Sequence, residues 1–115
     1  MQFITAVISI AALVLGVSAS PIKSDPHIAD FRLFGEKACF DENEGVWTVL
    51  HSDLNKCTSF NGETVKSVLL TDINKGCKLW IYCDEHCSSD KTQVHTGTEH
   101  CRSTDKEWKS WKLKC

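Results

Sequence analysis

Short segments rich in β-branched and aromatic residues recur along the chain and predict β-strands. Clusters of Gly, Asn, Asp and Ser separate them, as is typical of turns. From residue 31 onward, apolar residues keep a helical spacing for no more than about one turn. The pattern therefore predicts an all-β domain. The predicted strands are residues 31–34, 46–50, 65–71, 79–83 and 108–114.

The amino-terminal segment has a different pattern. Residues 3–15 form an apolar run broken only by Thr5 and Ser9, and Val17-Ser18-Ala19 follows it. The run is too short to span a bilayer, and the small residues after it are typical of a signal-peptide cleavage site. We expect a signal peptide over 1–19, a flexible leader with both prolines over 20–30, and one domain over 31–115.

Composition favours an extracellular protein. The chain has 115 residues, seven cysteines and a formal net charge of −2, and every cysteine lies after residue 19. So small a domain buries a modest core, which disulfides commonly supplement in secreted proteins. The near-neutral charge argues against a nucleic-acid-binding protein. No second apolar stretch predicts a transmembrane anchor.

The domain contains an internal repeat. Residues 31–34 precede Cys39 by the spacing at which residues 79–82 precede Cys87. Several landmarks in the same order predict two tandem units, here called unit one (about 31–72) and unit two (about 77–115). The other matching landmarks are the segments 65–70 and 108–113, which share a Lys-Ser pair, and the cysteines Cys57 and Cys101.

These landmarks resemble the Greek-key motif of the βγ-crystallins, in which an aromatic residue precedes a Phe or Cys and a Ser-containing strand follows. With its added cysteines, the motif pattern of this chain is similar to that of fungal small secreted cysteine-rich proteins, some of them related to killer toxins. The resemblance implies a disulfide-stabilised sandwich of two tandem Greek-key motifs, with Gly at positions where this chain has Asp41 and Ser89. The shared motifs are Phe-x-Leu-Phe…Cys, Val-Trp-Thr, Cys-x-x-Phe-x-Gly, Val-x-Ser-Val, Cys-x-Leu-x-x-Tyr-x-Asp-x-x-Cys and Trp-x-x-x-Lys-x-Cys.

The repeat narrows the pairing of the seven cysteines. One bridge within each unit respects the duplication and predicts Cys39–Cys57 and Cys87–Cys101. In the Greek key that the chain resembles, the first and last strands of a unit are antiparallel neighbours, so a third bridge, Cys77–Cys115, would set their register. Cys83 then remains as a free thiol, either buried or linking two copies.

The same resemblance implies the register of each unit. On one face of unit two, Leu79 lies opposite Leu113 and Ile81 opposite Trp111. An apolar stripe results in both units. The other predicted pairs are Trp80 with Lys112, Tyr82 with Ser110, Phe34 with Ser67, Phe31 with Leu70 and Leu33 with Val68.

We expect no metal, cofactor or catalytic site. Where βγ-crystallin calcium clamps supply a hydroxyl oxygen, this chain has Lys66 and Lys109, whose ammonium groups repel Ca²⁺. No nucleophile elbow or spaced carboxylate pair is recognisable, so the prediction is a non-enzyme. The five histidines lack the spacing of a metal site and are expected on the surface: His27, His51, His86, His95 and His100.

The candidate partner surface combines cations and tryptophans. In the predicted register Lys78, Trp80, Lys112 and Lys114 share an outward face, with Trp108 at its edge. Such a face is either merely solvated, with Lys112 on the indole of Trp80, or a contact surface for an anionic or sugar-bearing partner. The region from Glu36 to Asp53 has the opposite character, with five acidic residues and one lysine.

We therefore expect a secreted, monomeric, non-enzymatic binding protein, with a Cys83-linked dimer as the alternative state. The resemblance implies an effector-like role toward a host or competitor, through an extracellular protein or glycan. Two alternative functions remain. One is a killer-toxin-like antimicrobial that perturbs membranes, and the other is a glycan- or cell-wall-binding protein that uses Trp80 and Trp108.

Overall fold

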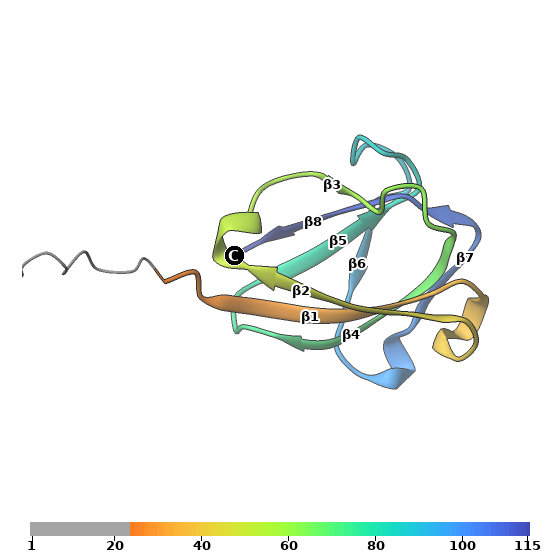
Figure 1. Ribbon diagram of the computed structural model, residues 1–115, viewed down its shortest axis with the longest axis horizontal. Helices are drawn as coiled ribbons and strands as arrows, with labels where there is room; N and C mark the ends of the chain where they lie inside the picture. The colour runs from red at the N-terminus through yellow and green to blue at the C-terminus, as the bar shows by residue number, and fades with distance from the viewer. Residues whose placement is uncertain (1–23) are drawn as a thin grey trace, which may run out of the picture.

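The computed structural model describes residues 24–115, so the predicted signal peptide and the first residues of the predicted leader lie outside it (Figure 1). No helix in this range is long and apolar enough to cross a membrane. The elements are β1 (His27–Phe34), η3 (Lys37–Cys39), β2 (Asn43–Leu50), η4 (His51–Asp53), β3 (Thr58–Ser59), β4 (Val65–Ile73), β5 (Lys78–Tyr82), β6 (Thr92–Val94), η5 (Thr98–His100), β7 (Arg102–Trp108) and β8 (Ser110–Lys114).

The strands form two four-stranded sheets, which confirms the predicted all-β sandwich of two Greek-key motifs. The first sheet has the order β2-β1-β4-β7, and the second has the order β3-β8-β5-β6. Each unit keeps three strands in its own sheet and contributes its third strand, β3 or β7, to the other sheet. The two units are therefore interlocked by strand exchange (Figure 1).

The first and last strands of each unit pair in the predicted register. All seven predicted pairs occur, and the inward-facing members have an exposure of 3% or less. The alternation of apolar residues thus determined which face of each strand is buried. The inward pairs are Leu79 with Leu113, Ile81 with Trp111, Phe31 with Leu70, and Leu33 with Val68.

An aromatic cluster joins the two sheets. Phe31 of β1 stacks on Trp47 of β2, with ring centroids 6.2 Å apart, and meets Trp111 of β8 edge-on at 5.5 Å. Phe60, just after β3, contacts Trp47 edge-on at 5.7 Å. Such pairs contribute about 0.5–1.5 kcal/mol beyond their buried area. The cluster therefore holds Trp47, which is only partly buried, in a defined orientation.

One predicted disulfide and the free thiol are present. Cys77–Cys115 joins the segment before β5 to the residue after β8. Cys83, which follows β5, is free and half-buried. Its Sγ lies 4.0 Å from the hydroxyl of Thr104.

The other two predicted bridges are wrong. Cys39 bonds to Cys101, and not to its predicted partner Cys57. Cys87 bonds to Cys57, and not to its predicted partner Cys101. The reason is the strand exchange, because β3 carries Cys57 towards the sheet of unit two and β7 carries Cys101 towards the sheet of unit one. Both bridges therefore join the two units, and they still occupy equivalent positions in the repeat.

Each unit folds its first hairpin over a buried serine. Ser67 Oγ donates to the carbonyl of Glu36 at 2.6 Å and accepts from the Cys39 N–H at 2.9 Å. Ser110 Oγ donates to the carbonyl of Asp84 at 2.6 Å. Both serines are fully buried, and their hydroxyls pair with backbone groups that are costly to leave unpaired.

The hairpin corners form without the glycines that the resemblance implies. Glu42 and Asp90 have φ of 56°, one residue after the expected glycine positions. Cys39 and Cys87 also have positive φ, at 53° and 57°. Non-glycine residues rarely adopt this conformation. Its occurrence at matching positions of both units shows that the corner geometry, like the strand register, is duplicated.

The first strand begins earlier than predicted. β1 starts at His27, so residues 27–30 belong to the domain and not to a flexible leader. Ile28 and Ala29 are buried, and Ala29 pairs with Val49 of β2 and Ile73 of β4. The alternation is hard to recognise here because Pro26 precedes the strand and Asp30 interrupts it.

Candidate functional site

The outward face of β5 and β8 carries the lysines of the predicted surface. Lys78 lies opposite Lys114, and Trp80 lies opposite Lys112. Directly opposed strand residues have Cα atoms about 4.5–5.5 Å apart, so the like charges of Lys78 and Lys114 repel each other. Within residues 24–115 none of these lysines forms an ion pair. The face therefore has uncompensated positive charge.

Lys91 completes this face, although the sequence did not reveal it. Its Nζ lies 4.4 Å from the centroid of the Trp80 ring, so the cation over the indole is Lys91 and not Lys112. Lys91 comes directly before β6, which pairs with β5. Lys91 could have been identified if residues 92–94 had been predicted as a strand that pairs with 79–81, because Lys91 directly precedes that strand. We call the five residues Lys78, Trp80, Lys91, Lys112 and Lys114 the basic face.

A pocket of about 220 Å³ opens within the basic face and is also lined by Tyr82, Cys87 and Ser88. Burial, and to a lesser degree the charge of Asp84, raises the pKa of Tyr82. The phenol is therefore neutral and able to donate a hydrogen bond at physiological pH. Cationic side chains beside neutral donors suit a carboxylate, sulfate or phosphate group.

Trp108 does not belong to the basic face, contrary to the prediction. It ends β7 in the first sheet, where it pairs with Val65. Its side chain is only 4% exposed, and its Nε1 donates to the carbonyl of Arg102 at 3.1 Å. The prediction was wrong because residues 108–114 are not one strand. The chain turns at Lys109 and continues as β8 in the second sheet.

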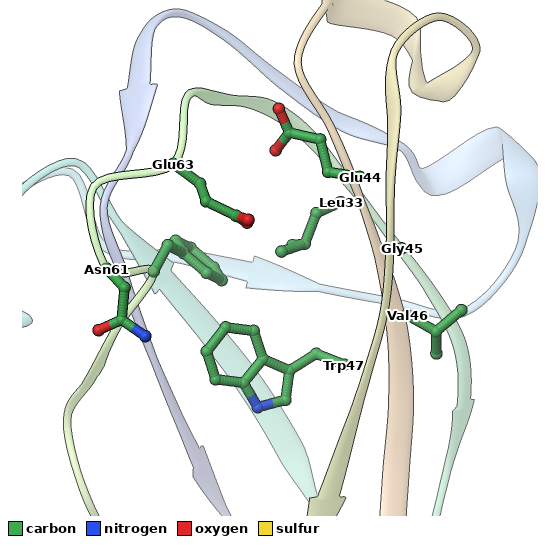
Figure 2. Close-up of a pocket in the computed structure, with 8 residues that line it drawn as sticks. Leu33, Glu44, Gly45, Val46, Trp47, Asn61 and Glu63 are labelled. Atoms are coloured by element: carbon green, nitrogen blue, oxygen red, sulfur yellow. The ribbon is translucent and has the colours of Figure 1, made fainter.

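A second pocket, of about 310 Å³, lies between β2 and the β3–β4 connection (Figure 2). The carboxylates of Glu44 and Glu63 lie on one side of it, and Trp47 lies on the other. We call it the acidic pocket. Its lining residues are Leu33, Glu44, Gly45, Val46, Trp47, Phe60, Asn61 and Glu63.

A β-bulge positions Glu44. Leu33 of β1 pairs with Gly45, whereas the next residue, Phe34, pairs with Asn43. Glu44 is therefore the extra residue of the bulge, a feature that commonly redirects a side chain. Gly45 has φ of 111°, which is accessible to glycine with little strain.

The carboxylates of the acidic pocket are poorly compensated. Burial raises the pKa of Glu44, and the charges of Glu63 and Glu42 raise it further. A Cβ at position 35 would lie 2.9 Å from Glu44 Oε2, so Gly35 makes room for this carboxylate. Neither Glu44 nor Glu63 forms an ion pair within the described part of the chain. The acidic composition from Glu36 onward indicated negative charge here, but only the fold brings Glu63 to it.

The histidines lie at the surface, as predicted. His27 Nε2 lies 2.9 Å from Asp30 Oδ2, and Asp72 is close enough to share an ion with them, with potential ligand atoms within 4.8 Å of one another. Thr48 donates to the other oxygen of Asp30 at 2.8 Å. These hydrogen bonds lower the pKa of Asp30. His27, Asp30 and Thr48 therefore form a hydrogen-bonded cluster at the surface.

No family model matches the chain, and no curated protein or solved structure matches it in the corresponding comparisons. The fold itself defines a class, that of small all-β sandwiches built from two Greek-key motifs. Within this class the protein has three disulfides, two of which join the motifs, and it presents a basic face and an acidic pocket.

Proposed function

We propose that this protein is a secreted, non-enzymatic binding protein that engages an anionic extracellular partner through its basic face. The observation that carries the proposal is the grouping of four lysines around Trp80 without a carboxylate partner in residues 24–115. The resemblance to fungal small secreted proteins implies that the partner belongs to a host or competitor, which is an effector-like role.

Two features support secretion. The apolar run at the amino terminus is typical of a signal peptide. Three disulfides in so small a domain are typical of proteins that fold in an oxidising compartment.

The arrangement of the lysines indicates a partner with repeated negative charge. Lys112 and Lys114 are two positions apart on β8, which separates them by about 7 Å on the same face of the strand. Lys78 lies directly across from Lys114. A partner with successive anionic groups would relieve the repulsion between these lysines and attract the protein over a distance.

The experiment measures binding of polygalacturonate oligomers to the mature, oxidised protein by isothermal titration calorimetry. Neutral galactan oligomers of matching length are the comparison ligand. We expect binding of the acidic oligomers only, and about tenfold weaker affinity after the single substitution Lys114→Glu. Arg32→Glu is the matched control, because it makes the same type of charge change at an exposed position on β1 of the other sheet.

Equal binding of neutral and acidic oligomers would contradict an anionic partner. It would favour the glycan-binding alternative, in which Trp80 contacts the sugar. Leakage of dye from phosphatidylglycerol vesicles, together with growth inhibition, would instead support the membrane-perturbing alternative. Equal weakening by the control substitution would show that net charge, and not the basic face, governs binding.

A further inference from the structure

The acidic pocket shares no lining residue with the basic face and has the opposite charge. We propose that it binds a lysine side chain of a protein partner. This would be a second contact, independent of the anionic partner of the basic face. The inference concerns the bulged edge of β2 and the β3–β4 connection, and it does not depend on the proposed function.

The walls of the pocket suit both parts of a lysine side chain. Leu33, Phe60 and Trp47 provide apolar surface for the methylene stem. Glu44 and Glu63 provide carboxylates for the ammonium group (Figure 2). Trp47 is held by stacking on Phe31 and by edge contacts with Phe60 and Trp111, so this wall of the pocket is formed without a ligand.

The charges of the pocket favour a cation. Glu44 reaches the pocket from the β2 bulge and Glu63 from the β3–β4 connection, so two separate elements converge there. Burial and neighbouring carboxylates disfavour the charged form of Glu44. Glu63 also lines a smaller pocket together with Lys109, but these two residues do not form an ion pair. An incoming ammonium group would therefore supply compensation that the described chain does not.

The surroundings of the pocket favour a protein over a small ligand. Val46 is 53% exposed, with its side chain on the face of β2 opposite to Trp47 (Figure 2), and Phe40, on the same β1–β2 hairpin, is 81% exposed. They are the large apolar side chains that residues 24–115 leave exposed. Exposed apolar and aromatic side chains on the hairpin that carries a charged anchor are typical of protein interfaces. A Cβ at Gly45 would meet no atom within 4 Å, so partner backbone can approach the bulge closely.

The test uses the full mature protein and the peptide acetyl-Gly-Lys-Gly-amide, followed by amide and indole chemical shifts in NMR spectra. The matched probe replaces lysine by norleucine, which keeps an apolar stem and removes the charge. We expect saturable shifts at Gly45 and at the Trp47 indole with the lysine peptide, and at least fivefold weaker binding after Glu44→Gln or Glu63→Gln. Glu99→Gln, on η5, is the control and should leave the affinity unchanged.

Three results would overturn the proposal. The first is equal shifts with the norleucine peptide, or no shifts at the pocket with either peptide. The second is tighter binding of glucosamine oligomers than of the lysine peptide, which would assign the pocket to a cationic glycan. The third is the same shifts on raising the protein concentration without peptide, which would make a second copy of this chain the occupant. Dispersed spectra of each variant establish that it is folded.

Discussion

Two buried serines illustrate how single residues hold this fold. Ser67 and Ser110 occupy equivalent places in the two units, and each bonds to the backbone of a hairpin that folds over it. Their Lys-Ser context was visible in the sequence as part of the repeat. Their role was not, because it depends on which backbone groups the hairpin brings to the hydroxyl.

The substitution Ser67→Ala would leave the carbonyl of Glu36 and the N–H of Cys39 without their partner. Because these groups are partly buried, we expect the free energy of unfolding to fall by about 1–3 kcal/mol, measured by urea denaturation. Ser89→Ala, at an exposed position, is the control and should change stability by less than about 0.5 kcal/mol. Equal effects of the two substitutions would show that the Ser67 hydroxyl does not stabilise the hairpin.

The thiol of Cys83 is predicted to be unreactive. Burial raises its pKa, and the hydrogen bond with Thr104 only partly opposes this effect. A raised pKa means that the thiol stays protonated to higher pH, so alkylation by iodoacetamide should begin at higher pH than for free cysteine. The rate, followed by mass spectrometry, should rise when urea unfolds the protein. Covalent dimers that vanish in Cys83→Ser would contradict this prediction.

At the scale of elements, the exchange of β3 and β7 between the sheets decides the disulfide pattern. Each of these strands follows a cysteine and lies beside strands of the other unit. The sequence could not reveal the exchange, because β3 has only two residues and the alternation within β7 is weak. Both pairings, within units and between units, are compatible with the repeat, and only the strand order distinguishes them.

Peptide mapping tests this pattern directly. Tryptic digestion of the oxidised protein should yield residues 38–56 linked to 92–102, and residues 57–66 linked to 79–91. A parallel digest of reduced protein, analysed by mass spectrometry, shows the separate peptides. Recovery of residues 38–56 linked to 57–66 would contradict the strand exchange in the oxidised protein.

At the scale of the whole molecule, a small net charge conceals two regions of opposite sign. The basic face lies on the second sheet, and the acidic pocket adjoins β2 at the edge of the first. A net charge of −2 therefore does not describe how the protein meets a partner. Attraction of an anion to the basic face depends on the local lysines and is screened by salt.

Raising the ionic strength should accordingly weaken the binding of polygalacturonate to the intact protein. Between about 0.05 and 0.5 M salt the Debye length falls from roughly 14 to 4 Å, so we expect affinity to drop by about tenfold or more. Calorimetry at both salt concentrations measures the change. Affinity that stays constant over this range would show that the contact is not electrostatic.

Two features could be predicted from the residues alone, the all-β class and the duplication, because local alternation and the matching of two units are written along the chain. The register of the central strands and the Cys77–Cys115 bridge were predicted from the resemblance to the Greek-key motif. Three other features could not be predicted from the chain: the partners of Cys39 and Cys57, the burial of Trp108, and the meeting of Glu44 with Glu63. Each of these depends on which sheet a strand joins, and that is set by long-range packing of the two units.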